Sequence, residues 1–275
     1  MSVLQAVILG IVQGLTEFIP VSSTAHLILV ESLMGLNLEA DAVLAFNVLI
    51  QLGTALALIV YFWSDWWAIA RALAGGLAAR QPWRDADSRL GWLLVVATIP
   101  GAVLGLLLKK PVEQLHQNAA WVAVILMAAA LLLFAAERVG ARARSLTTLK
   151  WLDALLIGSA QAIAVIPGVS RSAATISMGL VRNFERPAAA RFSFLMSAPI
   201  LLAAGLYEAR DLLKLPNLNA YLAPLAVGFV VAAVVGFLAI RWLLAYLSTR
   251  SLNAFGWYRI AAGAFFLVVV FLSGR

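Results

Sequence analysis

Cysteine is absent from the 275 residues, and histidine occurs only twice. The first absence excludes disulfides, thiolate metal sites and a cysteine nucleophile, and the second excludes a histidine-rich metal centre. Charge is also scarce, because 12% of the residues are charged, against roughly 25% in soluble domains. The net charge of +7 does not indicate nucleic-acid binding, since Lys and Arg lie in short loops between apolar runs, where they set membrane orientation.

Apolar residues make up 63% of the chain, and the mean hydropathy is +0.96. No water-soluble fold buries that much apolar surface, so we expect an integral membrane protein with membrane lipid as its surroundings. A helix needs roughly 20 apolar residues to cross a bilayer. The stretches that meet this requirement are 42–64, 90–108, 119–137, 190–207, 220–241 and 254–273. The sequence therefore predicts an all-α protein with six transmembrane helices in a single domain, residues 1–275.

Two further apolar stretches, 1–35 and 151–183, are interrupted near their middles by Pro20 and by Pro167 with Gly168. Each half has only about 15 residues, which at about 1.5 Å per residue is too short to cross the bilayer. We therefore predict two re-entrant helix hairpins. Their irregular tips must be surrounded by protein or by a water-filled cavity.

The two interrupted stretches resemble each other at an offset of 148 residues. The coinciding pairs include Gly10/Gly158, Gln13/Gln161, Val21/Val169, Ser22/Ser170 and Ala25/Ala173. Each repeat, about 1–140 and about 150–275, would hold one hairpin and three spans. An odd number of spans inverts the second copy, so the pattern predicts an inverted-topology repeat.

Basic residues test this topology. If the first hairpin enters from outside, thirteen Lys and Arg residues lie on the cytoplasmic side and five on the outer side. This bias predicts that both termini face outward. The two remaining cations, Arg171 and Arg259, lie inside apolar stretches, where charge is costly and normally paired or used.

Hairpins that enter from opposite faces would bring their tips together near the membrane midplane. We expect four side chains there to be catalytic: Glu17, Ser23, His26 and Arg171. We expect six more residues to bind substrate: Gln13, Ser22, Thr24, Gly168, Ser170 and Ser172. A guanidinium, several hydroxyls, and a turn that aims backbone N–H groups at an anion suit phosphoryl transfer.

In this hypothesis Arg171 binds two phosphate oxygens, and Glu17 with His26 transfers protons. The nucleophile is left open between His26, Ser23 and a water molecule. Several structural interpretations compete. Ser172 and Thr175 could each simply bond the backbone carbonyl four residues back. His26 could be a packed polar residue, and Glu17 could pair structurally with Arg171. We expect His116 to lie on the surface.

A secondary transporter is the alternative class, because inverted repeats and broken helices are typical of transporters. A lipid-phosphate flippase would use the same pocket without releasing phosphate.

Two long motifs, Gln13–His26 and Pro167–Ile176, resemble the undecaprenyl-diphosphate phosphatases of the bacitracin-resistance protein family. Shorter matches at Ile50–Gly53, Arg191–Phe194 and Trp257–Arg259 extend the similarity over nearly the whole chain. The resemblance implies hydrolysis of undecaprenyl diphosphate to undecaprenyl phosphate and inorganic phosphate. This reaction recycles the lipid carrier of peptidoglycan synthesis and confers bacitracin resistance.

The resemblance also implies functional roles at Gln13, Glu17, Ser23, Thr24, His26, Ser170 and Arg171. It further implies a Mg2+ or Ca2+ cofactor, to which Glu17 and Gln13 would be the ligands. We also expect the protein to lie in a bacterial cytoplasmic membrane, with its pocket open to the outer face, and a homodimer is possible. This sequence departs from the family at Gln13, where many members have Glu, and at Ala25 and Ala173, where glycine is common.

Overall fold

The computed structural model describes residues 1–36, 40–116, 118–212 and 218–273, and this part of the chain contains no β-strand. The helices are α1 (Val3–Phe18), α2 (Ser23–Leu33), α3 (Ala40–Tyr61), α4 (Trp63–Ala78), α5 (Ala86–His116), α6 (Ala119–Ala128), α7 (Ala130–Arg138), the 3₁₀ turn η1 (Leu146–Thr148), α8 (Trp151–Ile163), α9 (Arg171–Val181), α10 (Arg186–Leu212), α11 (Leu218–Leu247) and α12 (Asn253–Ser273).

Six segments of the described chain are long and apolar enough to cross a membrane. They are Val43–Tyr61, Ala86–Leu108, Ala119–Arg138, Arg186–Arg210, Tyr221–Leu247 and Asn253–Leu272. Each one overlaps a span predicted from hydropathy, so the prediction of six transmembrane helices is confirmed. The protein is a multi-pass helical membrane protein.

The two interrupted stretches each form a pair of short helices, α1 with α2 and α8 with α9, and the members of each pair pack on each other. α1 ends at Phe18, and Ile19 is extended with φ −62° and ψ 133°, as expected for a residue before proline. In the second pair Gly168 has φ +94°, and a Cβ there would lie 2.7 Å from the carbonyl oxygen of Val122. Only glycine fits that position.

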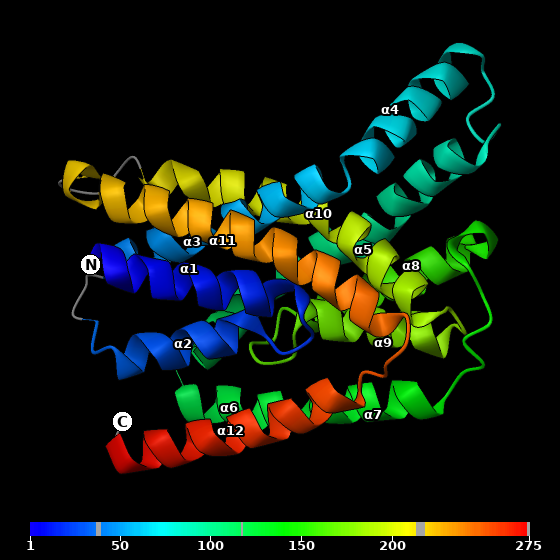
Figure 1. Cartoon of the computed structure of the whole chain (residues 1–275). Helices are drawn as coiled ribbons and strands as arrows, with labels where there is room; N and C mark the ends of the chain where they lie inside the picture. Colours follow the sequence, from blue (N-terminus) through cyan, green and yellow to red (C-terminus); the bar gives the residue numbers. More distant parts are fainter. Residues whose placement is uncertain (37–39, 117, 213–217, 274–275) are drawn as a thin grey trace.

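Neighbouring helices surround both pairs. α1 packs along α11, α11 also packs on α3, α8 packs on α5, and α6 and α7 pack on α12 (Figure 1). The turns between the short helices therefore lie among the spans and not at their ends. The first turn of α1 and the last turn of α12 are on the same side of the bundle (Figure 1).

Two features were not predicted. Trp63–Ala78, for which no helix was predicted, forms α4, which projects from the body together with the start of α5 (Figure 1). The third span is two helices, α6 and α7, that meet at Ala129. The side chain of His116 lies outside the described residues, so its predicted surface position stays a prediction.

Candidate active site

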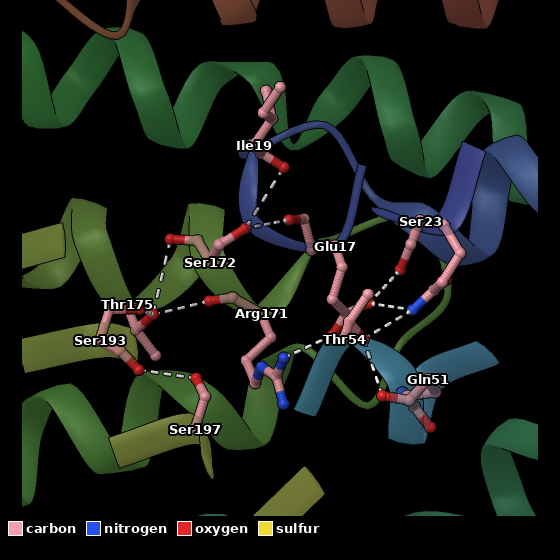
Figure 2. A network of polar contacts seen from close by, with 12 residues as sticks. Glu17, Ile19, Ser23, Gln51, Thr54, Arg171, Ser172, Thr175, Ser193 and Ser197 are labelled. Atoms are coloured by element: carbon pink, nitrogen blue, oxygen red, sulfur yellow. Dashed lines mark hydrogen bonds and ion pairs between the residues drawn. The ribbon is translucent and has the colours of Figure 1, made fainter. Parts of the chain in front are cut away.

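The end of α1 and the start of α9 meet through Glu17 and Arg171. Arg171 Nη2 donates to Glu17 Oε1 at 2.5 Å, although the two residues are 154 positions apart in the sequence. The side chain of Glu17 is 6% exposed and that of Arg171 is 16% exposed. Figure 2 shows both side chains pointing toward the same space. The acid and the guanidinium predicted to share one site are therefore in direct contact.

The second oxygen of Glu17 joins two more predicted residues to the site. Glu17 Oε2 accepts hydrogen bonds from Ser23 Oγ at 2.7 Å and from Gln13 Nε2 at 3.0 Å. Gln13 Nε2 also lies 3.4 Å from the hydroxyl oxygen of Thr54, which donates to the carbonyl of Gln51 (Figure 2). The carboxylate is thus held by α1, α2 and α9, with α3 behind it.

The serines of the second turn lie beside this centre. Ser170 has φ 73°, caps α9 by accepting from the N–H of Ala173, and shares a 3.1 Å hydrogen bond with Ser172. Ser172 Oγ lies at 3.5 Å from the carbonyl oxygen of Ile19 in the first turn. Ser172 therefore contacts the first turn, and not the carbonyl four residues back that its structural interpretation names. Its predicted role in substrate binding stays a prediction.

Thr175 is farther from the centre. Its hydroxyl donates to the carbonyl of Arg171 at 2.8 Å and lies 2.5 Å from Ser193 Oγ (Figure 2). A backbone bond one turn back is the common role of threonine in membrane helices. We assign no chemistry to Thr175.

A cavity of about 190 Å³ opens at this centre. Its polar lining residues are Glu17, Ser22, Ser23, Thr24, Gln51, Ser170 and Arg171. The other lining residues are Ala164–Gly168. Arg171 is the cation of this lining, and its Nε has no hydrogen-bond partner among the described residues. A buried donor without a partner is costly.

His26 is placed differently from the other predicted catalytic residues, because it does not appear among the residues lining the cavity. Its Nδ1 lies 2.8 Å from the carbonyl oxygen of Ser22, and its Nε2 lies 2.8 Å from the hydroxyl of Tyr258. A carbonyl can only accept, so Nδ1 carries a proton and donates to Ser22. The ring therefore holds Ser22, whose φ of 74° lies in the left-handed region.

Arg259 is the second buried cation, and its contacts explain why an apolar helix contains it. The side chain is fully buried and donates to four backbone carbonyls. They belong to Pro20 at 3.2 Å, Leu126 at 3.1 Å, Gly168 at 2.7 Å and Val169 at 3.0 Å. The guanidinium thus bridges both turns and the end of α6.

Sequence reasoning assigned no role in the site to Tyr258, Arg259, Gln51 or Thr54. A signal existed for the first two in the Trp257–Arg259 motif, and for Gln51 in the Ile50–Gly53 motif. Hydropathy indicated that Arg259 needed partners. It did not indicate that these partners would be carbonyl groups.

The predicted cation site has one carboxylate. Within the residues that the structure describes, no group of three or more His, Cys, Asp or Glu side chains could hold a metal ion. Glu17, Ser23 and Thr24 line the cavity, with Gln13 beside Glu17. The oxygens of Glu17, Ser23 and Thr24 suit Mg2+ or Ca2+ when substrate phosphates supply further ligands, whereas Gln13 presents its amide nitrogen to Glu17.

Elsewhere in the molecule, charge is concentrated at two buried carboxylates. Asp153 is bonded by Arg144 and Arg182, at 2.7 Å each. Glu137 is bonded by Arg142 at 3.0 Å and by Arg186 at 2.6 Å. These pairs join α7, α8, α9 and α10 and do not line the cavity of Glu17.

The fold and the site define a multi-pass helical membrane protein with a buried polar pocket between two helix breaks. The profile of a family described as "Bacitracin resistance protein BacA" matches residues 6–265. Curated relatives named "Undecaprenyl-diphosphatase" align over nearly their whole length. The relative from Anaeromyxobacter dehalogenans is 46% identical, covering 100% of this chain and 93% of its own. The relative from Chlorobium phaeobacteroides is 43% identical, covering 96% and 95%, and that from Nocardioides is 40% identical, covering 97% and 96%.

The chain belongs to the bacitracin resistance protein BacA family. It is therefore a phosphatase, and the resemblance inferred from Gln13–His26 and Pro167–Ile176 is confirmed.

Proposed function

We propose that the protein hydrolyses undecaprenyl diphosphate to undecaprenyl phosphate and inorganic phosphate. One observation carries the proposal: Glu17, Ser23 and Arg171 converge on one buried cavity through bonds of 2.5 and 2.7 Å. A cation with a free donor, a hydroxyl and a carboxylate in contact are the groups that phosphoryl transfer requires.

Arg171 binds the terminal phosphate in this mechanism. A guanidinium has five N–H donors, and Nη2 is the one that donates to Glu17. Arg171 lines the cavity, so its other guanidinium N–H groups can bind phosphate oxygens. The N-terminus of α9, which begins at Arg171, adds backbone N–H groups and a positive dipole end.

Ser23 is the nucleophile that the geometry favours, because its hydroxyl already donates to Glu17 at 2.7 Å. Its Oγ forms a bond to the terminal phosphorus, and Glu17 takes the hydroxyl proton. The bond from that phosphorus to the bridging oxygen breaks, and undecaprenyl phosphate leaves. Water then attacks the phosphoserine, inorganic phosphate leaves, and a proton returns to Ser23. A water molecule held by Glu17 could instead attack directly, which is the alternative.

His26 acts in this scheme as a positioning residue. Its ring donates to the Ser22 carbonyl and is bonded to Tyr258, so it orients the turn that presents Ser23. A Mg2+ or Ca2+ ion held by Glu17, Ser23, Thr24 and Gln13 would neutralise phosphate charge when bound.

We further propose that α1–α2 and α8–α9 are re-entrant hairpins of an inverted repeat. Two observations support this: α1 packs on α11 as α8 packs on α5, and the residues before α2 and α9, Ser22 and Ser170, share φ values of 74° and 73°. The positive-inside bias supports a cytoplasmic membrane location with both termini and the pocket facing outward. There the enzyme would recycle the lipid carrier of peptidoglycan synthesis and confer bacitracin resistance.

Phosphate release by the purified protein tests the proposal. Undecaprenyl or farnesyl diphosphate is supplied in detergent, and Glu17→Gln, Ser23→Ala and Arg171→Ala are assayed beside the parent. Each variant should lose at least about a hundredfold in kcat/KM. Arg191→Ala is the matched control, because it breaks the Asp65–Arg191 ion pair away from the cavity. Binding of the lipid without phosphate release would overturn the proposal and favour the flippase.

A further inference from the structure

α4 has a counterpart in only one half of the proposed repeat. In the first half α4 stands between the spans α3 and α5. In the second half the corresponding spans, α10 and α11, are separated by residues 213–217 alone. α4 and the start of α5 also project from the body of the protein (Figure 1). This helix pair is therefore an addition to the repeat, and its outer side has no neighbouring span.

The outer side of α4 is apolar. Five exposed residues are spaced by four or three positions, which places them on one side of the helix. They are Trp63, Trp67, Ala70, Ala74 and Leu77. The two tryptophans are 62% and 55% exposed, and Leu77 is 58% exposed. The opposite side of α4 packs on α5 through Ile69 and Leu73, which lie beside Gly91.

The side of the pair that faces the body is apolar as well. A groove of about 300 Å³ lies between α4, α5 and α10. Trp66 and Thr98 are its polar lining residues, and the hydroxyl of Thr98 donates to the carbonyl of Leu94 at 2.7 Å. A projecting helix pair that is apolar on both sides is stable among hydrocarbon chains and not in water. Lipid is therefore the occupant that fits both sides.

The same helix pair carries an excess of cations. Residues 71–89 contain four arginines and two acids, Asp85 and Asp87. Arg84 pairs with Asp85, whereas among the described residues neither Arg71 nor Arg80 forms an ion pair. The guanidinium carbon of Arg71 lies 5.5 Å from the centroid of the Trp67 ring. Cations beside exposed tryptophans suit a membrane surface with negatively charged headgroups.

We propose that α4 and the start of α5 bind anionic phospholipid. Trp63, Trp67 and Leu77 lie against its acyl chains, and Arg71 and Arg80 bind its phosphate group. In the proposed topology this lipid belongs to the cytoplasmic leaflet. None of the residues that line the cavity of Glu17 comes from α4 or α5. Lipid binding here does not depend on the proposed reaction, so the failure of either one leaves the other standing.

Lipid binding by the full chain tests the proposal. Phosphatidylglycerol and phosphatidylcholine are titrated onto the protein in detergent, and bound lipid is counted by native mass spectrometry. The double variant Arg71→Gln with Arg80→Gln should lose about fivefold in phosphatidylglycerol affinity for each arginine removed. Its affinity for uncharged-headgroup phosphatidylcholine should not change. Equal affinities of the parent for the two lipids would overturn the inference, as would an unchanged phosphatidylglycerol affinity in the double variant.

Arg210→Gln is the matched control for charge. Arg210 also lies over an aromatic ring, with its guanidinium carbon 4.0 Å from the centroid of Tyr207. It belongs to the last turn of α10, at the far end of the bundle from α4 (Figure 1). The variant should bind both lipids as the parent does. An equal loss of phosphatidylglycerol affinity in this control would overturn the inference, because any exposed arginine would then serve.

The depth of α4 in the membrane is an independent readout. The chain has no cysteine, so Ala74→Cys can carry a single spin label on the exposed side of α4. In vesicles of equal parts phosphatidylglycerol and phosphatidylcholine, oxygen dissolved in lipid should reach the label more readily than a water-soluble nickel complex. Val234→Cys is the lipid-facing reference, since Val234 is 56% exposed within the candidate span Tyr221–Leu247. A label at position 74 reached mainly by nickel would overturn the inference, because α4 would then project into water.

Discussion

Glu17 and Arg171 are in contact at 2.5 Å although 154 residues separate them, and each comes from a different broken helix pair. A buried ion pair can be structural or catalytic, and these alternatives differ in what Arg171→Lys does. Lysine keeps the charge next to Glu17 and loses the planar fork. We expect kcat/KM to fall at least about tenfold while the apparent Tm in detergent is kept. Unchanged activity would support the structural pair.

Ser23 and His26 can be separated by trapping the reaction. Rapid quenching of the parent with farnesyl diphosphate, followed by peptide mass spectrometry, should place phosphate on Ser23 and not on His26. His26→Ala should still lower kcat about a hundredfold, because the Ser22 turn loses its hydrogen bond and Ser23 is misplaced. The phosphoserine should still be detectable in that variant, and phosphate on His26 in the parent would contradict the assignment.

Arg259→Lys tests how far both turns depend on one guanidinium. An ammonium group has three donors and no fork, so it cannot reproduce four bonds to carbonyls in three segments. We expect a loss of kcat of about tenfold or more with KM less affected. Arg241→Lys, on the exposed side of α11, is the control. Full activity in Arg259→Lys would show that the turns hold their geometry without the fork.

Gln13→Glu would place a second carboxylate beside Glu17. Gln13 Nε2 donates to Glu17 at 3.0 Å, and the substitution replaces that bond by repulsion between like charges. A divalent cation relieves the repulsion, so the variant should need less Mg2+ or Ca2+ for half-maximal activity than the parent. It should also lose more activity than the parent in EDTA. Identical cation titrations would argue against a metal at these residues.

Asp153 predicts a pH-dependent contribution to stability. Burial raises the pKa of this carboxyl, but hydrogen bonds from Arg144, Arg182 and the Lys150 N–H outweigh burial and lower the pKa overall. A lowered folded-state pKa stabilises the protein above the unfolded-state pKa, and the effect disappears as the pH falls through the folded value. Asp153→Asn should cost about 3 kcal/mol at pH 7 and progressively less toward acid pH.

Asp85→Asn is the control for that measurement, because the Asp85–Arg84 pair is solvent-exposed and exposed pairs contribute little. The apparent Tm in detergent should drop for Asp153→Asn and stay constant for Asp85→Asn. If the drop in apparent Tm caused by Asp153→Asn were the same at all pH values, Asp153 would act through packing and not through charge.

Hydropathy alone predicted the six spans, because the free energy of placing a helix in lipid depends on its own side chains. The two helix breaks were also predictable from local sequence, because Pro20 and Pro167 restrict the backbone and Gly168 permits conformations that other residues avoid. α4 was missed because its apolar run is short and its charges resemble those of a loop.

The sequence by itself determined which residues lie near the two breaks and, through the motifs Gln13–His26 and Pro167–Ile176, the family. Only the tertiary structure decided which buried polar groups form hydrogen bonds with each other. It placed Ser23 on Glu17, turned His26 toward Tyr258, and gave Arg259 four carbonyl partners. The physical reason is that helix-forming and membrane-inserting tendencies are local. The choice of partner for a buried polar group depends instead on how distant helices pack and which donors and acceptors that packing leaves within reach.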